Sequence, residues 1–597
     1  MTRRQSPFLM ALGLAACYLA LNATALTYGA SSWANQVNQS RPHNLVLSSL
    51  GVTRKATPIP CFVDPTAAIH TDPRLRLLLV SGLDGSRDSV HATLELANWL
   101  TQSAAAAGLR SDCAISVVPC VNIDGLAENL GPRNGVGGDP SRGYPPSPKS
   151  AYHSPTNPER SYLWRWIGMH APDLVLEVRA APQEGSSFEQ TGSDAWAIPR
   201  DDPNDSLVRQ LATASAANTG TIPSGVLRTG KSVSPEQRLR LFAAVIARYQ
   251  GKVSAARIEL QRRLKRGPLT VAKELSGHYG HDLNNVVYIP AVALIGRLRL
   301  GQLTDDSAQL SRVEKIVGPY FRGETATAPK SGSGLSGHLV FCELADRTRG
   351  ASRQRYVELA RNAADLAFDG QGHLRPEMPY HVEMSDAVFM GGPILARVGQ
   401  LTGDARYYAA CIQHLKFMKR LDLREDGLYR HSPLDTAAWG RGNGFPAIGV
   451  AMCLTALPAS HPDRKQLLTA FRDHLTALAG HQDYTGCWHQ VIDRPESYRE
   501  FTSTCMITFA MIRGVRSGWL DADRYAPHIK RAWYAIRTRI GPAGHLVDVC
   551  TGTGKQPNLR AYYDRPAILG RDNRGGAMAL LVATELAAYV GPNGQIE

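Results

Sequence analysis

Short apolar runs alternate with amphipathic stretches over roughly residues 75–300. The expected strands are 75–80, 114–118 and 174–178. The expected helices are 90–101 and 161–169. This alternation predicts a mostly parallel sheet covered by helices. A stretch rich in Gly and Pro, residues 131–158, is expected to form a loop, and binding residues often lie on loops.

From about residue 301 the pattern changes to helices alone. Apolar residues recur there at helical spacing, as at Leu395 and Val398. The expected helices are 337–347, 352–368, 383–401, 405–421, 447–457, 465–479, 502–518, 525–540 and 575–590. Repeated helical hairpins joined by Gly-rich loops predict stacked pairs or a closed toroid.

Length and charge add two constraints. A chain of 597 residues is too long for one ordinary core, so we expect two or more domains. The formal charge of +14 favours anionic partners, such as nucleic acid, an acidic polysaccharide or a membrane surface. No basic low-complexity tail is present, so an acidic carbohydrate is as plausible a partner as nucleic acid.

The N-terminus has the pattern of a targeting segment. Arg3 and Arg4 precede an apolar run, and Ala-Thr-Ala at 23–25 offers a cleavage site. We therefore expect residues 1–25 to be a signal peptide and the chain to be exported to the periplasm or the exterior. Lipoprotein anchoring through Cys17 is the alternative. No other stretch approaches the ~20 apolar residues of a membrane span.

The ten cysteines are dispersed and include no Cys-x-x-Cys pair. This spacing argues against a zinc ribbon or a disulfide scaffold. Buried thiols are the simpler interpretation.

Three segments concentrate polar side chains in the helical half. Asp386 opens an apolar run, His431 ends Gly-Leu-Tyr-Arg-His, and residues 439–445 read Trp-Gly-Arg-Gly-Asn-Gly-Phe. A lone loop His or Arg is usually solvated, and a Trp in a helical domain usually packs in the core. The repeated glycines favour close backbone approach. The clustering therefore indicates an active site.

The first half resembles the zinc carboxypeptidase family across about 200 residues. The matching blocks are 80–87, 118–125 and 138–145. The family's zinc ligands, a His and a Glu after the first strand and a second His after a later one, correspond here to Asp84, Arg87 and Arg179. Arginine stays protonated and does not ligate zinc. The resemblance therefore implies a carboxypeptidase-like α/β domain with no metal and no peptidase activity.

Arg133 and Arg142 fall where that family places arginines that hold the substrate carboxylate, so they form a candidate carboxylate site. The alternative is a degenerate scaffold with an internal ion-pair network. Its members would be Asp84, Arg87, Asp88, Glu177 and Arg179.

The second half resembles the unsaturated rhamnogalacturonyl and glucuronyl hydrolases, glycoside hydrolase families 105 and 88. The matching blocks are 386–390, 401–404, 427–431, 439–445 and 500–506. The resemblance implies an (α/α)6 toroid. It also implies a glycoside hydrolase that hydrates the C4–C5 double bond of an unsaturated uronate at the non-reducing end of lyase-generated oligosaccharides.

By the same resemblance Asp386 is the general acid and then the base toward water. The expected substrate-binding residues are His431, Trp439, Arg441, Asn443, Thr502 and Thr504. Glu383, expected on the same helical face as Asp386, would raise the pKa of that carboxyl group. We expect an acidic oligosaccharide as the partner. No cofactor, metal or nucleic acid is expected.

One departure concerns a second Asp that family members commonly carry shortly before residue 337. The corresponding stretch here, 331–334, reads Ser-Gly-Ser-Gly.

Two other functions stay open: a non-catalytic binder of acidic glycans and a metallopeptidase. The expected organisation is a signal peptide (1–25), a linker (26–60), the α/β domain (61–300), a linker with the first helix (301–330) and the hydrolase domain (331–597).

Overall fold

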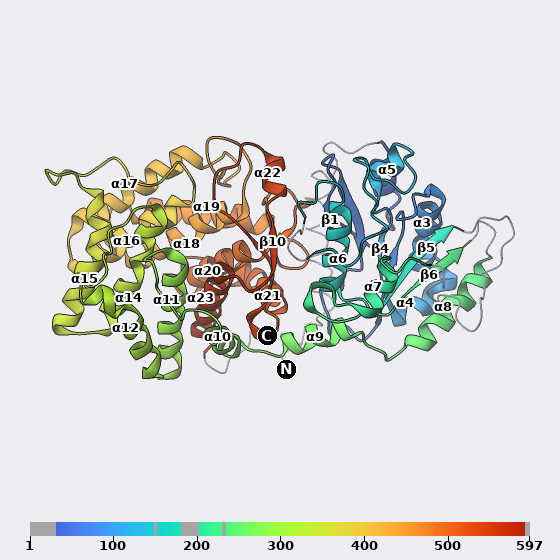
Figure 1. The fold of residues 1–597 in the computed structure, drawn as a ribbon, viewed down its shortest axis with the longest axis horizontal. Helices are drawn as coiled ribbons and strands as arrows, with labels where there is room; N and C mark the ends of the chain where they lie inside the picture. The colour runs from blue at the N-terminus through green and yellow to red at the C-terminus, as the bar shows by residue number, and fades with distance from the viewer. Residues whose placement is uncertain (1–31, 148–151, 181–201, 230–233, 592–597) are drawn as a thin grey trace, which may run out of the picture. The chain divides into compact units, whose positions relative to one another are not determined.

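The computed structural model describes residues 32–147, 152–180, 202–229 and 234–591 (Figure 1). The chain divides into two compact units, Met1–Arg263 with Arg494–Tyr498 and Leu264–Asp493 with Arg499–Glu597. The expected signal peptide and Cys17 lie outside the described residues. Within the described part, no helix is both long enough and apolar enough to cross a membrane.

The first unit is built on a six-stranded mixed sheet in the order β1-β2-β4-β3-β5-β6 (Figure 1). The strands are β1 (Val46–Val52), β2 (Pro58–Val63), β3 (Leu75–Val80), β4 (Cys113–Val118), β5 (Leu174–Ala180) and β6 (Ser224–Thr229). Strands β3 to β6 pair in parallel, and β1 and β2 add an antiparallel edge. All residues of β3 and β4 are buried, as expected for parallel strands covered on both faces.

The described part of the first unit also contains helices, several of which pack against the sheet. They are α2 (Ser32–Gln39), α3 (Arg87–Gln102), α4 (Ala107–Asp112), α5 (Ile123–Ala127), α6 (Pro158–His170), α7 (Leu207–Thr213), α8 (Pro235–Tyr249) and α9 (Ala255–Leu264). Alternate strand residues such as Leu77 and Leu79 share a core with Leu96 of α3 and Phe242 of α8. A mixed sheet covered by helices is therefore confirmed, while the carboxypeptidase likeness stays a prediction.

Six helices form a closed ring in the second unit. They are α11 (Tyr288–Thr304), α14 (Leu339–Arg347), α16 (Ala387–Thr402), α18 (Gly440–Ala456), α20 (Phe501–Arg516) and α23 (Asn573–Val590). Each helix contacts the next, and α23 returns to contact α11 (Figure 1). The expected helical toroid-type fold is confirmed.

A second layer of helices packs outside the ring. Its members are α10 (Pro268–Ser276), α12 (Ser307–Phe321), α15 (Gly350–Ala364), α17 (Ala405–Asp422), α19 (Arg464–Gly480) and α21 (Ala522–Thr538). The short elements of the unit are α13 (Gly332–Gly337), α22 (Leu559–Tyr563), β7 (Trp488–His489), β8 (Arg499–Glu500), β9 (Leu546–Cys550) and β10 (Ala567–Gly570). All residues of α18 except Thr455 are buried, because a ring helix is covered by neighbours on every side.

Two expected boundaries differ from the structure. The helical unit begins at Leu264 and not after residue 300, because α10 and α11 pack against α23. Helix α18 begins at Gly440, although the helix expected here began at residue 447. Its glycines allow close helix approach, since an added Cβ would lie 2.7 Å from the His489 carbonyl oxygen at Gly440 and 2.9 Å from Ser385 Oγ at Gly442.

Candidate active site

The N-terminal ends of the ring helices gather at one place. The Tyr288 ring, at the start of α11, lies 6.3 Å from Phe389 of α16 and 5.6 Å from Phe445 of α18. Cys550 of β9 connects the start of α18 to the starts of α20 and α23. Its carbonyl accepts from Arg441 at 2.6 Å and Arg574 at 3.0 Å, and its N–H donates to Glu500 Oε1 at 2.9 Å. Helix N-termini are electropositive, so their convergence favours an anionic ligand.

Asp386 and His431 meet in this region. Asp386 is the N-cap residue of α16 and is 3 % exposed, and His431 is fully buried. His431 Nε2 lies 3.2 Å from Asp386 Oδ2, and His431 Nδ1 lies 2.8 Å from the Tyr562 hydroxyl. Burial lowers the pKa of His431, against the opposing effect of the Asp386 carboxylate, so the imidazole is neutral at neutral pH.

Buried polar atoms without partners are concentrated around this pair. Apart from the 3.2 Å contact between Asp386 Oδ2 and His431 Nε2, no hydrogen-bond partner is found within the described part of the chain for the Asp386 carboxylate, Ser385 Oγ, Trp439 Nε1 or Gln490 Oε1. Buried polar groups in folded proteins are nearly always paired. The cluster therefore has the character of a binding site.

Arg565 provides a guanidinium group that sequence inspection did not single out. Its Cζ atom lies 4.5 Å from the Trp439 ring centroid and 5.5 Å from that of Tyr562. Arg565 Nη2 donates to the Gly554 carbonyl, whereas Nε and Nη1 have no hydrogen-bond partner among the described residues. The side chain is 5 % exposed, so two charged N–H groups are buried without a hydrogen-bond partner among the described residues.

The structure places Arg441 and Asn443 differently from the expectation that they bind substrate. Arg441 donates to the carbonyls of Cys550 and Gly552, and its Cζ lies 4.6 Å from the Trp439 ring centroid. Asn443 Nδ2 donates to the carbonyls of Tyr429 and Trp439 at 2.8 and 3.0 Å. Both side chains are fully buried, and these hydrogen bonds hold the site together, while Arg441 Nε has no hydrogen-bond partner among the described residues.

Thr502 and Thr504 are also used by the fold. Glu500, the N-cap of α20, accepts from the N–H of Thr502 at 3.0 Å and from its hydroxyl. The Thr504 hydroxyl donates to the Glu500 carbonyl at 2.7 Å and accepts from the Trp488 N–H at 3.1 Å. These bonds fix the start of the helix and leave both threonines inside the packing.

Glu383 does not share a helical face with Asp386, so that expectation is wrong. Helix α16 begins at Ala387, and Glu383 lies in the preceding turn with φ of 54°. Its carboxylate is exposed and pairs with Lys555 Nζ at 2.9 Å, which lowers the pKa of Glu383. A turn before the helix directs the side chain outward.

A different acidic residue, Asp422, lies fully buried at the end of α17. Burial is the main cause that raises its pKa to about 8; Arg430 opposes the rise and Asp386 adds to it. The stretch 331–334, where a second Asp was expected, forms the N-cap and first residues of α13. No sequence signal distinguished Asp422, because its burial results from contacts with segments outside α17.

In the first unit, the two arginines of the candidate carboxylate site are exposed. Arg142 pairs with Asp205 at 2.8 Å, and Arg133 donates to the Gly137 carbonyl at 3.2 Å.

The ion-pair network expected in the first unit is only partly formed. Arg179 pairs with Glu177 at 2.7 Å and with Asp202 at 2.9 Å. Arg87 donates to Leu126 carbonyl oxygen and does not pair with Glu177, so the expected ion-pair network differs in membership. Over the described ranges, no group of three or more His, Cys, Asp or Glu side chains has the arrangement of a metal site.

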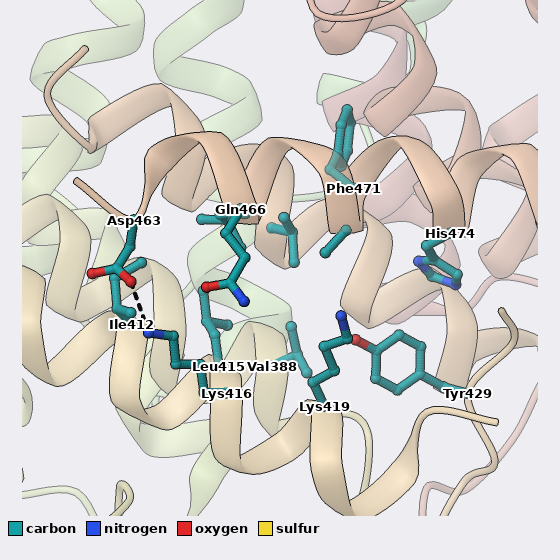
Figure 2. A pocket seen from close by; sticks show the side chains of 13 residues that line it. Val388, Ile412, Leu415, Lys416, Lys419, Tyr429, Asp463, Gln466, Phe471 and His474 are labelled. Carbon is teal, nitrogen blue, oxygen red and sulfur yellow. Dashed lines mark hydrogen bonds and ion pairs between the residues drawn. The ribbon is translucent and has the colours of Figure 1, made fainter. Parts of the chain in front are cut away.

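A separate cavity of about 620 Å³, counted with its solvent-open part, lies between α17 and α19 (Figure 2). Apolar side chains from both helices line it, and Lys416 at its edge pairs with Asp463 at 2.7 Å. Tyr429 and His474 also line the cavity, whereas its described lining includes neither Asp386 nor His431.

Comparison with known proteins identifies relatives of the helical unit. The chain is 27 % identical over 215 residues to the unsaturated rhamnogalacturonyl hydrolase YesR of Bacillus subtilis (strain 168), covering 34 % of this chain and 57 % of that protein. It is 26 % identical over 201 residues to an unsaturated 3S-rhamnoglycuronyl hydrolase of Alteromonas sp. (strain LOR), covering 32 % and 48 %. The chain thus spans about half the length of these curated relatives.

Two solved structures also align with the chain. A family 105 glycoside hydrolase from C. acetobutylicum ATCC 824 aligns with 53 % of this chain and 99 % of its own, at 19 % identity and a TM-score of 0.47. An unsaturated glucuronyl hydrolase specific for heparin covers 55 % and 97 %, at 12 % identity and a TM-score of 0.43. The sequence profile of Glycosyl Hydrolase Family 88 matches residues 269–590, more than half of the chain, and the protein therefore belongs to that family.

Proposed function

We propose that the helical unit hydrates the C4–C5 double bond of an unsaturated uronate at the non-reducing end of lyase-generated oligosaccharides. The observation that carries this proposal is the buried pair Asp386–His431, 3.2 Å apart, among polar atoms that lack partners in the described chain. Membership of Glycosyl Hydrolase Family 88 and the activities in the names of the relatives support the same reaction.

The chemistry needs one carboxyl group that first gives up a proton and then takes one back. Asp386 donates its proton to C4, and a water molecule adds its oxygen to C5 while its proton passes to the Asp386 carboxylate. The resulting hemiketal opens and expels the remaining sugar. Atoms balance with one water consumed, and Asp386 ends in its starting state.

His431 positions this carboxyl group. Its ring lies between Asp386 and the Tyr562 hydroxyl, and its neutral state adds no positive charge that would favour the ionised carboxylate. A fixed acid beside the substrate supplies the orientation that general acid catalysis requires.

Arg565 is the residue that we assign to the uronate carboxylate. Its Nε and Nη1 atoms have no partner among the described residues, and arginine binds carboxylates through paired N–H groups. The nearby Trp439 ring supports the guanidinium by a cation–π contact. Arg441, which was expected in this role, is occupied by two backbone carbonyls.

The test follows the ultraviolet absorbance of the double bond. Purified protein should remove this absorbance from lyase digests of pectin, ulvan-type polysaccharide or glycosaminoglycan, and Asp386→Asn should reduce the rate by about 10²- to 10⁴-fold. Equal rates for the two proteins on every digest would reject the proposal. Tight sugar binding in calorimetry without turnover would instead favour the non-catalytic glycan binder.

For the first unit we propose a carboxypeptidase-like scaffold without zinc. Asp84 and Arg87 follow β3, and Arg179 lies in β5, where it pairs with Glu177 and Asp202. Elemental analysis of the purified protein tests this, because stoichiometric zinc would contradict it.

We also propose that the chain is exported and that residues 1–25 are removed. N-terminal sequencing of the mature protein tests this proposal.

A further inference from the structure

Asp422 is a buried carboxyl group that the reaction described above does not use. It is the last residue of α17 and has an exposed fraction of 0 %. Considering only the described residues, neither of its carboxylate oxygens has a hydrogen-bond partner. Its nearest cation is Arg430, whose Nε lies 3.7 Å from Asp422 Oδ1. A buried carboxylate without hydrogen bonds is costly even beside this cation, so the position calls for a physical explanation.

The chain links Asp422 directly to the Asp386 pair. The Asp422 carbonyl accepts from the Arg430 N–H at 3.0 Å. The next residue, His431, reaches Asp386 with its ring, and its carbonyl accepts from the Ser385 N–H at 3.0 Å. Segment 430–431 therefore lies between the end of α17 and the start of α16.

The charged groups around Asp422 determine its protonation. Burial raises its pKa to about 8, Arg430 and Lys555 oppose the rise, and Asp386 and Glu383 add to it. The buried Tyr429 hydroxyl is the further titratable group that interacts with Asp422. The end of a helix also disfavours a negative charge. Asp422 thus carries a proton at neutral pH.

We propose that Asp422 is a positioning residue that holds a proton for the Asp386–Asp422 pair and so keeps a carboxylic acid available to the substrate. The inference rests on the proposed function of Asp386. Two carboxyl groups in one buried region resist the doubly ionised state, which favours a proton on one of them. The pair therefore retains one proton to a higher pH than a single carboxyl group in the same surroundings.

The first experiment compares pH profiles of kcat/KM for the full-length wild type and Asp422→Asn. The Asn side chain has the same shape but holds no exchangeable acid proton. At about pH 5 the two proteins should agree within about threefold, and the variant should fall about tenfold behind by about pH 8. A ratio that does not change with pH would mean a merely structural role and would overturn the proposal.

Two further variants separate charge from packing. Asp422→Glu keeps a titratable carboxyl group and should restore the shape of the wild-type profile, even if its absolute rate is lower. Asp473→Asn makes the same chemical change at an exposed position of α19 and should leave the profile unchanged. A profile for Asp422→Glu that matches that of Asp422→Asn would contradict the assignment.

A stability measurement tests the proton without using activity. The folded pKa of about 8 lies above the ordinary 3.8, so the cost of Asp422 grows as pH rises from about 4 to about 8. Asp422→Asn should have the same Tm as the wild type at about pH 4. At about pH 8 its Tm should be about 5 °C higher than that of the wild type. A constant difference would overturn the proposal. Absence of turnover in the wild type, with the melting shift intact, would reject the proposed function and with it the role of the proton in catalysis.

Discussion

His431 Nε2 lies 3.2 Å from Asp386 Oδ2, while the other ring nitrogen lies 2.8 Å from the Tyr562 hydroxyl. The imidazole thus joins the start of α16 to α22, elements that are far apart in the sequence. Since burial keeps this ring neutral, its contribution is positional more than electrostatic.

Removing either the His431 ring or the Tyr562 hydroxyl should lower kcat. We expect about a 100-fold loss for His431→Phe, which removes the contact with Asp386, and about a tenfold loss for Tyr562→Phe, which removes only the anchor of the ring. Steady-state kinetics on an unsaturated oligosaccharide measure both. A Tyr562→Phe loss that exceeds the His431→Phe loss would contradict the positional role.

Substitution of Arg565 should act mainly on substrate binding. Arg565→Gln loses the charge and should raise KM by about 10- to 100-fold, the range expected for a charged hydrogen bond. Arg565→Lys keeps the charge but not the paired geometry, so its KM should lie between those of the wild type and Arg565→Gln. Unchanged KM for Arg565→Gln would show that the uronate carboxylate binds elsewhere.

Acid should destabilise the protein partly through His414, which lies buried beneath the start of α16. Its Nε2 lies 2.8 Å from the Ala387 carbonyl oxygen, and burial lowers its pKa from 6.5 to about 4. Between these values the unfolded chain binds a proton that the folded chain does not. Stability therefore falls as pH drops from about 6.5 to about 4, by about 3 kcal/mol at the lower limit.

Denaturant titrations at several pH values measure this effect. His414→Gln should show a shallower decline with acid than the wild type, although it is less stable at neutral pH. His373→Gln changes a histidine that is 79 % exposed and should keep the wild-type slope. Parallel slopes for all three proteins would contradict the assignment.

The glycines of α18 give a prediction about packing. Gly442→Ala places a Cβ 2.9 Å from Ser385 Oγ and should cost about 1–3 kcal/mol of unfolding free energy. Gly480→Ala, at the exposed end of α19, meets no described atom within 4 Å and should be neutral or stabilising by up to about 1 kcal/mol. Chemical denaturation of the two variants makes the comparison, and equal effects would count against close packing at Gly442.

Periodicity alone predicted four of the outer helices closely, for example 405–421 against the observed Ala405–Asp422, but it missed α10. Among the ring helices, α20 and α23 were also predicted to within two residues, whereas α18 was expected to begin seven residues too late, because its Gly and Arg residues resemble those of a loop. Helix α11 was missed for the same reason and was assigned to the α/β domain. Close packing, which is a property of neighbours, decides these boundaries.

The sequence by itself determined the two-part organisation, the helical second half and the ordered blocks around Asp386, His431 and Trp439. Only the tertiary structure decided which polar atoms are available to a ligand. Arg441 donates from both terminal nitrogens to carbonyls more than a hundred residues away and keeps only Nε without a described partner, whereas Arg565 keeps both Nε and Nη1. Asp422 acquires its proton from burial and from charges on other segments. Hydrogen-bond partners and dielectric surroundings arise from long-range contacts, and these contacts exist only in the folded chain.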